Sequence, residues 1–358
     1  MSGPSCGRVL ALLGICLVLN GRVADSATGE PHWSYTGPHG QDHWKETYPI
    51  CGEDNQSPVD VRTDATRLVP DLPPVSVLGY DAPSQTTYNM TNNGHTLFVK
   101  LPPGMEMSGG GLPWRYEAVQ FHLHWGSAGR QLGSEHYVDG VQYAAEIHIV
   151  HFNKEKYKSA DEATKKVDGL AVLGVLVEVG PRDNEVFTVF MKELGKVKYS
   201  GQQTVVQAFS ILSLLPKELG HFFRYNGSLT TPGCDETVTW TLLHKPIEVS
   251  VAQLTTLTTG LAFTEASAPV ASTMENNFRF PQPLGQRKIL TSFPLPSQRP
   301  KGLRVGDILA IIFGILFVIC FVVLVIYCFS QRRKTSRQSA TKRDVIYKPA
   351  ANHDGVQI

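Results

Sequence analysis

The chain has 358 residues, of which 42% are hydrophobic and 18% are charged, the composition of an ordinary globular protein. Its formal net charge is +1, but residues 331–358 carry seven Lys or Arg against two Asp, so residues 27–330 are mildly acidic. A body without a basic face argues against a nucleic-acid partner.

The N-terminus is typical of a secretory signal peptide. Arg8 precedes an uncharged apolar run at residues 9–19, and Ala24-Asp25-Ser26 offers small residues for cleavage. We therefore assign residues 1–26 to a signal peptide and expect the body to be exported. A short buried helix at the N-terminus is the alternative.

The body has the pattern of a β protein. Between residues 75 and 240, short apolar runs alternate with turn signals such as Asn92-Asn93-Gly94. The clearest segments are a strand apolar on both faces at 169–179 and helices at 185–194 and 251–257. We predict one mainly β (α+β) domain over residues 27–293, with a large twisted, mostly antiparallel sheet and short peripheral helices.

The C-terminal part reads as a membrane anchor. Residues 308–329 carry no charge and are long enough to cross a bilayer as a helix. The basic residues that follow indicate the cytoplasmic side. We predict a single-pass type I protein of the plasma membrane, with its body outside; its parts are a stalk at 294–306, a transmembrane helix at 307–329 and a disordered basic cytoplasmic tail at 330–358. A fully apolar core helix is the alternative.

Small residues recur in the predicted span. Gly306, Ala310 and Gly314 are four residues apart and would lie on one side of the helix. Such a stripe would let two copies approach closely as a homodimer. Chance recurrence is the alternative.

Six cysteines divide by compartment. Cys6 and Cys16 lie in the signal peptide, and two more lie in the span, which leaves Cys51 and Cys234 in the exported body. Two thiols in an oxidising compartment are expected to pair. Two buried free thiols are the alternative.

Three sequons are candidate glycosylation sites. Asn55 is followed by Ser57-Pro58 in a region that reads as packed, so we expect no glycan there. Asn89 and Asn226 are the sites at which we expect one.

Two runs alternate along predicted strands, namely Gln120-Phe-His-Leu-His-Trp125 and Ala144-Ala-Glu-Ile-His-Ile-Val150. Residues two apart share a face, so His122 and His124 face one way, and His148 shares a face with Glu146. If the strands are neighbours, three imidazoles can converge, and three His ligands with an open fourth position are typical of catalytic zinc. Gln120 and Glu146 stand where an acceptor would fix a ring tautomer. Histidines with ordinary core partners are the alternative.

Further motifs extend this pattern, namely Asn93-Gly-His95, Gly133-Ser-Glu-His136, Gly227-Ser-Leu-Thr-Thr-Pro232 and Asn276-Asn-Phe-Arg279. With the two histidine runs, they resemble the α-class carbonic anhydrases over residues 32–293, and the whole chain resembles the membrane-anchored vertebrate types. The resemblance implies a zinc enzyme that reversibly hydrates carbon dioxide to bicarbonate and a proton, with zinc hydroxide as the nucleophile. It implies a role in extracellular pH and bicarbonate handling, and sulfonamides as inhibitors.

The resemblance also implies residue roles. His122, His124 and His148 would bind Zn²⁺, with Gln120 and Glu146 as outer partners of His122 and His148. Thr230 would accept a hydrogen bond from the hydroxide and donate one to Glu135. The other implied residues are the proton shuttle His95, Tyr35 in the solvent network, Thr231 near bicarbonate, and an apolar wall of Val150, Val172, Leu229, Val238 and Trp240.

Two positions depart from the family pattern. Gly233 stands where a second proline is usual, and we expect altered dynamics of the adjoining loop. Phe98 stands where soluble relatives carry an amide, and we expect slower proton transfer. The main rival function is a catalytically weak carbonic-anhydrase-like surface domain for ligand binding or adhesion. An ester-cleaving zinc hydrolase and a single-pass receptor are the other rivals.

Overall fold

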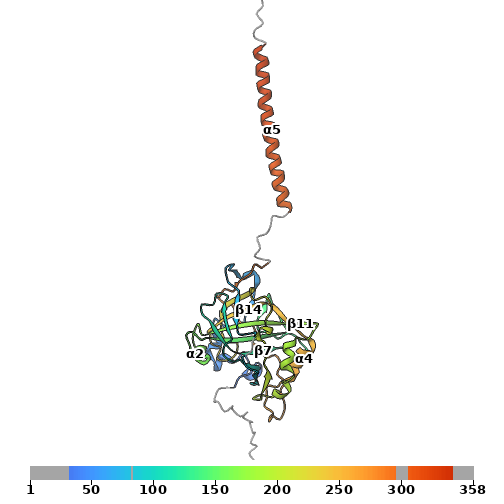
Figure 1. Ribbon diagram of the computed structural model, residues 1–358. Coiled ribbons are helices and arrows are strands. Elements are labelled where there is room, and N and C mark those ends of the chain that lie inside the picture. The colour runs from blue at the N-terminus through green and yellow to red at the C-terminus, as the bar shows by residue number, and fades with distance from the viewer. Residues whose placement is uncertain (1–31, 82–83, 296–304, 342–358) are drawn as a thin grey trace, which may run out of the picture. The chain divides into compact units, whose positions relative to one another are not determined.

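The computed structural model describes residues 32–81, 84–295 and 305–341 in two units, the body and a C-terminal helix. The predicted signal peptide, most of the predicted stalk and the last part of the predicted tail lie outside the described residues. The body contains fifteen strands and is mainly β, which confirms the predicted fold class (Figure 1).

The strands are β1 Asp60–Val61, β2 Arg67–Leu68, β3 Val75–Leu78, β4 Thr87–Asn92, β5 Leu97–Lys100, β6 Glu106–Gly109, β7 Tyr116–Trp125, β8 Tyr137–Val138, β9 Val141–Gln142, β10 Ala145–Asn153, β11 Leu170–Gly180, β12 Gln203–Gln207, β13 Phe222–Gly227, β14 Val238–Ser250 and β15 Leu290–Thr291. The main sheet has twelve of them, ordered β12-β4-β5-β7-β10-β11-β14-β13-β15-β2, with β6 also paired to β7 and β3 paired to β6. Only β11 with β14 and β15 with β2 are parallel within the main sheet as described. The remaining three, β1, β8 and β9, form a small separate sheet.

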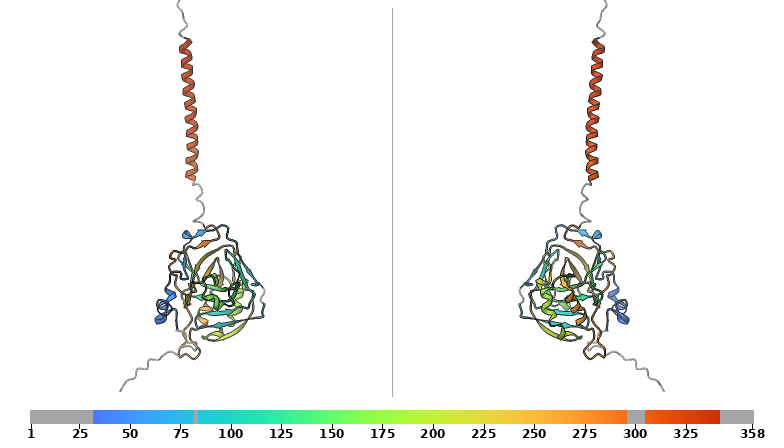
Figure 2. Two further views of the ribbon diagram at one scale, coloured as in Figure 1. Left: turned by 90° about the vertical axis from the view of Figure 1, so that its left-hand side faces the viewer. Right: turned by 90° about the vertical axis from the view of Figure 1, so that its right-hand side faces the viewer.

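Short helices surround the sheet in two further views (Figure 2). The α-helices of the body are α1 Trp44–Thr47, α2 Ala160–Thr164, α3 Glu185–Met191 and α4 Val251–Gly260, and the 3-10 helices are η1 Gly37–His39, η2 Pro49–Gly52, η3 Thr63–Ala65, η4 Leu194–Val197 and η5 Ile211–Leu214. Ser250 caps α4 in a capping box with Gln253, so this helix begins where the sequence predicts it and extends to Gly260. The helix predicted at 185–194 ends earlier, at Met191, before η4.

The central strand β10 is buried on both faces, whereas β7 buries one face and is half-buried at several positions of the other, including His122. They are antiparallel, with His148 opposite His122 and Glu146 opposite His124. On one face Phe121, Leu123 and Ile149 belong to the largest apolar core. On the other face lie the histidines, and beyond them Val150 joins a second apolar cluster. Each ring therefore projects from a backbone that is packed from behind, which restricts its position.

The disulfide joins Cys51 to Cys234 and confirms the predicted pair. It packs against Tyr35 and Trp44 in a third, aromatic cluster. The disulfide thus attaches the N-terminal segment to the loop that follows Thr231.

Helix α5 runs from Val305 to Thr341, and its segment Leu309–Lys334 is long and apolar enough to cross a membrane. The sequence-based prediction placed disorder from residue 330, and this is wrong for the first part of the tail. Residues 330–341 contain neither Pro nor Gly and are rich in Arg, Lys and Gln, which favour helix, so nothing ends the helix at the charged boundary.

Candidate metal centre

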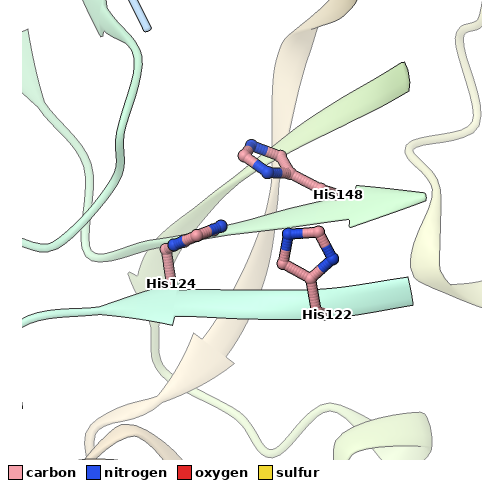
Figure 3. Close-up of side chains that lie close together, drawn as sticks. All are labelled: His122, His124 and His148. Atoms are coloured by element: carbon pink, nitrogen blue, oxygen red, sulfur yellow. The ribbon is translucent and has the colours of Figure 1, made fainter. Parts of the chain in front are cut away.

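Three histidines meet on one face of the central sheet (Figure 3). His122 and His124 project from β7 and His148 projects from β10. Their candidate ligand nitrogens all lie within 4.8 Å of one another. The predicted adjacency of the two strands therefore holds, and it brings the three rings together.

The second nitrogen of each ring has an oxygen partner. His122 Nδ1 lies 2.9 Å from Oε1 of Gln120, His124 Nδ1 lies 2.8 Å from the carbonyl of Asn277, and His148 Nε2 lies 2.8 Å from Oε1 of Glu146. These oxygens accept, so each ring carries its proton on the outer nitrogen. The lone pairs of His122 Nε2, His124 Nε2 and His148 Nδ1 are left for a ligand.

This donor set fits a zinc ion. Nε2 of His124 is buried and has no hydrogen-bond partner among the described residues. Burial lowers the pKa of all three rings, with a further contribution from neighbouring histidines, and for His124 it lowers the pKa to about 3. The rings are therefore neutral at physiological pH, as zinc ligands must be, and a cation would satisfy the unpaired nitrogen.

Glu135 is fully buried beside the triad. Its Oε1 accepts a hydrogen bond of 2.8 Å from the backbone N–H of Arg279. Its Oε2 has no hydrogen-bond partner within the described part of the chain and lies 3.9 Å from Nδ1 of His148. Burial raises the pKa of Glu135, while the hydrogen bonds from Thr230 and Arg279 lower it in part.

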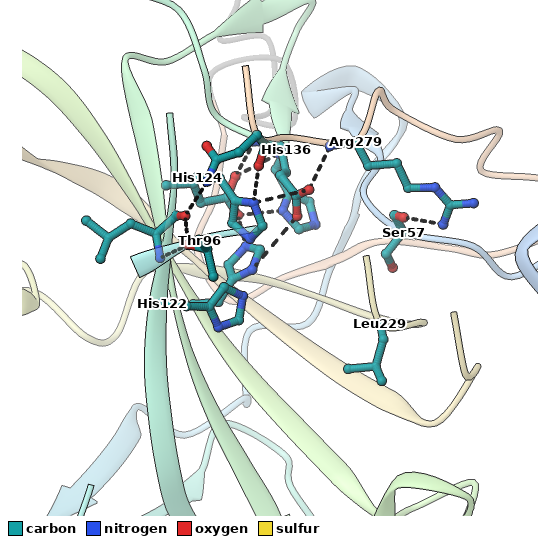
Figure 4. Close-up of polar contacts among 12 residues, drawn as sticks. Ser57, Thr96, His122, His124, His136, Leu229 and Arg279 are labelled. Carbon is teal, nitrogen blue, oxygen red and sulfur yellow. Dashed lines mark hydrogen bonds and ion pairs between the residues drawn. The ribbon is translucent and has the colours of Figure 1, made fainter. Parts of the chain in front are cut away.

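A chain of buried polar groups leads from His148 away from the metal centre, and Figure 4 shows His136 and Ser57 among the polar contacts of this region. Glu146 accepts hydrogen bonds from His148 and, at 2.7 Å, from Nδ1 of His136. Nε2 of His136 lies 2.6 Å from the Tyr225 hydroxyl, which donates to Ser57 Oγ at 2.9 Å. Burial alone would raise the pKa of Glu146, but His136 and His148 outweigh it and hold this pKa well below its usual range.

A cavity of about 600 Å³ opens beside His122 and His148. Of the predicted substrate wall, the cavity is lined by Val150, Val172, Leu229 and Trp240, and Thr230 and Thr231 also face it. Val238 is not among the described residues that line it; it is 2% exposed and packs in the apolar cluster that contains Val150, Val172 and Trp240. Phe98 lines the cavity from β5.

His95 and Tyr35 lie outside the described lining of this cavity. The His95 ring stacks on Trp33, with centroids 3.7 Å apart and planes 7° apart. Burial, with a contribution from His32, lowers the pKa of His95 to about 4. Tyr35 is 4% exposed, and burial raises its pKa.

Sequence reasoning missed the part that Asn277 plays. Its carbonyl accepts from His124, its Oδ1 accepts from the Trp125 N–H at 2.8 Å, and its Nδ2 donates to the carbonyls of His95 and Leu123. The motif Asn276-Asn-Phe-Arg279 was a signal for it, but only the fold places this segment beside β7.

The sequon residues differ in their surroundings. Asn89 and Asn226 are exposed, on β4 and β13. The Asn55 side chain instead donates to Oε2 of Glu236 at 2.9 Å. Glycan at Asn89 and Asn226 remains a prediction.

Comparison with known proteins gives one consistent result. A family model described as eukaryotic-type carbonic anhydrase matches residues 39–293. Human carbonic anhydrase 12 is 41% identical over 320 residues, covering 89% of this chain and 89% of that protein. Human carbonic anhydrase 3 is 41% identical over 264 residues (73% of this chain, 98% of that protein), and bovine carbonic anhydrase 6 is 38% identical over 272 residues (75% and 82%). The chain therefore belongs to the eukaryotic-type carbonic anhydrase family.

Proposed function

We propose that this chain reversibly hydrates carbon dioxide to bicarbonate and a proton at the extracellular face of the plasma membrane, with zinc held by His122, His124 and His148. The observation that carries the proposal is the buried, unpartnered Nε2 of His124 among the described residues, at the centre of three neutral imidazoles. A surface domain without catalytic function would gain nothing from leaving that nitrogen unpaired.

A zinc ion bound there would lower the pKa of a coordinated water to about 7, as is known for carbonic anhydrases, and so would supply a nucleophile at neutral pH. The residues around it would set orientation. In this proposal the Thr230 hydroxyl would donate its proton to Glu135, and its oxygen would remain as an acceptor beside the cavity that Thr230 lines. Thr230 would therefore favour a group that donates a hydrogen bond at the metal, and Glu135 would hold Thr230 in that role.

The cavity wall would select the substrate. Carbon dioxide is apolar and offers no charge to bind, so an apolar wall beside the metal suits it. Val150, Val172, Leu229 and Trp240 provide that wall. Val238 would act only indirectly, by packing within the same apolar cluster. Thr231 would contact bicarbonate.

The proton would leave by way of His95, with Tyr35 beside the route. In its position on Trp33 the His95 ring has a pKa of about 4, too low to take a proton efficiently at neutral pH. We infer that the ring must move off Trp33 toward solvent to act as a shuttle. Phe98 lines the cavity where soluble relatives carry a polar residue, and this would slow the transfer.

The same proposal includes the domain organisation. Residues 1–26 would be a cleaved signal peptide, 27–293 the extracellular enzyme, 294–306 a stalk, 307–329 the membrane span and 330–358 a cytoplasmic tail. The apolar segment of α5 supports the span. A homodimer through Gly306, Ala310 and Gly314 belongs to the proposal as well.

The decisive experiment combines metal analysis with stopped-flow hydration of carbon dioxide on the full-length protein. We expect one zinc per chain and activity that a sulfonamide abolishes. Protein that carries zinc at the triad but does not hydrate carbon dioxide would favour the binding or adhesion function. Protein that takes up no zinc would overturn the metal centre itself.

A further inference from the structure

The loop after Thr231 is held by an ion pair that the family resemblance does not account for. Nζ of Lys165 lies 2.9 Å from both carboxylate oxygens of Asp235. The Asp235 side chain is 8% exposed, whereas that of Lys165 is 67% exposed. The pair therefore joins a largely buried carboxylate to a cation at the surface.

Asp235 also organises the loop through its backbone. Its carbonyl accepts hydrogen bonds from the N–H of Leu229 at 3.0 Å and of Thr237 at 2.9 Å. Leu229 and the following Thr230 face the cavity beside the histidine triad. A displacement of Asp235 would consequently move the residues that the proposed reaction needs in place.

Lys165 directly follows helix α2, which forms another part of the cavity wall. Ala160, Asp161 and Thr164 of this helix line the cavity. A second contact runs parallel to the ion pair, because the Thr237 hydroxyl donates to the carbonyl of Thr164 at 2.9 Å. Two links therefore connect α2, which lines one part of the cavity, to the loop whose residues Leu229 and Thr230 line another part.

Gly233 fits this arrangement. A Cβ added at Gly233 would lie 3.0 Å from Oδ2 of Asp235 and 3.7 Å from Nζ of Lys165. Alanine or proline would crowd the carboxylate where it meets the lysine. The glycine that the sequence marked as a source of loop flexibility thus leaves room for an ion pair that restrains the same loop.

We propose that Asp235 and Lys165 are a positioning pair that sets the separation between α2 and the Leu229–Thr231 loop, and thereby the placement of Thr230. The inference rests on the proposed hydration activity. The pair contacts neither the substrate nor the metal ligands; it acts through the loop. Removing the lysine charge would leave a buried carboxylate unpaired, and the carboxylate would turn out toward water and take the loop with it.

The test compares Lys165→Met with Lys165→Arg and with the control Lys166→Met in the full-length, zinc-loaded protein. Lys166 is the neighbouring exposed lysine, and no ion pair of its side chain is seen in the described structure. We expect Lys165→Met to lower kcat/KM for carbon dioxide by about tenfold, since small misplacements near the reacting groups have large effects on rate. The value of kcat should change less than kcat/KM, because the loop acts in the hydration step and not in the proposed proton transfer by way of His95. Lys165→Arg should restore kcat/KM, and Lys166→Met should match the parent.

A second measurement does not depend on activity. Hydrogen exchange of the backbone amides of Leu229 and Thr237, which donate to Asp235, should accelerate in Lys165→Met and in Gly233→Ala, but not in Lys166→Met. Unchanged exchange together with unchanged kcat/KM in folded Lys165→Met would overturn the inference. If the proposed hydration activity itself is wrong, the parent protein will be inactive toward carbon dioxide. The hydrogen-exchange rates of the variants would still show whether Lys165 and Asp235 restrain the loop.

Discussion

The two faces of strand β10 each bury a histidine, and the two histidines differ in what surrounds them. His148 is 1% exposed and lies on the face of the metal centre, whereas His151 is fully buried on the face of the main apolar core. Both nitrogens of His151 have partners, the Tyr80 hydroxyl and the carbonyl of Ala171 at 3.1 Å. In the triad, by contrast, one nitrogen of each ring is directed at the other two rings.

The contrast shows how a ligand histidine differs from a core histidine when both are buried in the same sheet. Burial lowers the pKa in both places, so a low pKa alone does not distinguish them. The difference lies in the unpaired nitrogen: Nε2 of His124, the member of the triad on the neighbouring strand β7, has no hydrogen-bond partner among the residues described, whereas both nitrogens of His151 have one. The interpretation of a buried histidine as a satisfied core residue is therefore correct for His151, and the triad departs from it.

The largest expected effect is on zinc. His124→Ala should lower zinc affinity by more than about 100-fold, since loss even of an outer-shell partner costs 10- to 100-fold. The matched control on the other face, His151→Gln, should retain zinc. Metal content by mass spectrometry after dialysis checks both variants. If His124→Ala and His151→Gln retained zinc equally, His124 would not be a zinc ligand in any sense that His151 is not.

Loss of the disulfide, which lies away from both faces of β10, should lower stability without affecting zinc binding. The Cys51–Cys234 disulfide closes a loop of 183 residues in sequence separation. In the chain-entropy model, Cys51→Ser should lower the free energy of unfolding by about 5 kcal/mol. Urea unfolding measures the loss, and zinc stoichiometry of the folded variant should remain that of the parent. If the variant lost zinc while still folded, the aromatic cluster and the metal centre would be coupled.

His151 should make stability depend on pH. Its folded-state pKa of about 4 is lower than the ordinary value of 6.5, so the unfolded chain takes up the proton first as pH falls. The stability contribution is thus fully present above pH 6.5, is lost between pH 6.5 and 4, and is constant below. The loss amounts to roughly 3 kcal/mol. Unfolding of the parent and of His151→Gln across this range isolates it, because the other histidines contribute equally to both; identical curves would contradict the assignment.

The sequence predicted those features of the site that depend only on neighbouring residues in one strand. Alternation along 120–125 and 144–150 was enough to place His122, His124, Glu146 and His148 on the correct faces. The sequence could not show that Asn277 holds His124, because 153 residues separate them and only the fold brings them together. The same holds for Lys165 and Asp235, which lie on two surface segments. The strand order was equally inaccessible, since neighbours such as β4 and β12 are joined through a long intervening chain.

His95 differs from both the ligand histidines and His151, because it lies outside β10 and is only partly buried. It lies in the turn between β4 and β5, stacked on Trp33. A shuttle role predicts that His95→Ala lowers kcat by about tenfold, or roughly 1.4 kcal/mol in barrier, while kcat/KM and zinc content stay unchanged. Imidazole added to the buffer should restore part of kcat.

Trp33 makes this prediction sharper, because the stacked ring is held in a position where its pKa is about 4. Trp33→Ala would free the ring to enter solvent, where its pKa should rise toward the ordinary value of 6.5 and match the proton it must carry. We therefore expect Trp33→Ala to keep or increase kcat and His95→Ala to decrease it, although both remove the same stacking contact. Stopped-flow measurements in a bulky buffer that cannot enter the cavity would compare the two directly. An equal loss of kcat in both variants would mean that the stacked position of His95 is the working one, and an unchanged kcat in His95→Ala would mean that the proton leaves by another route.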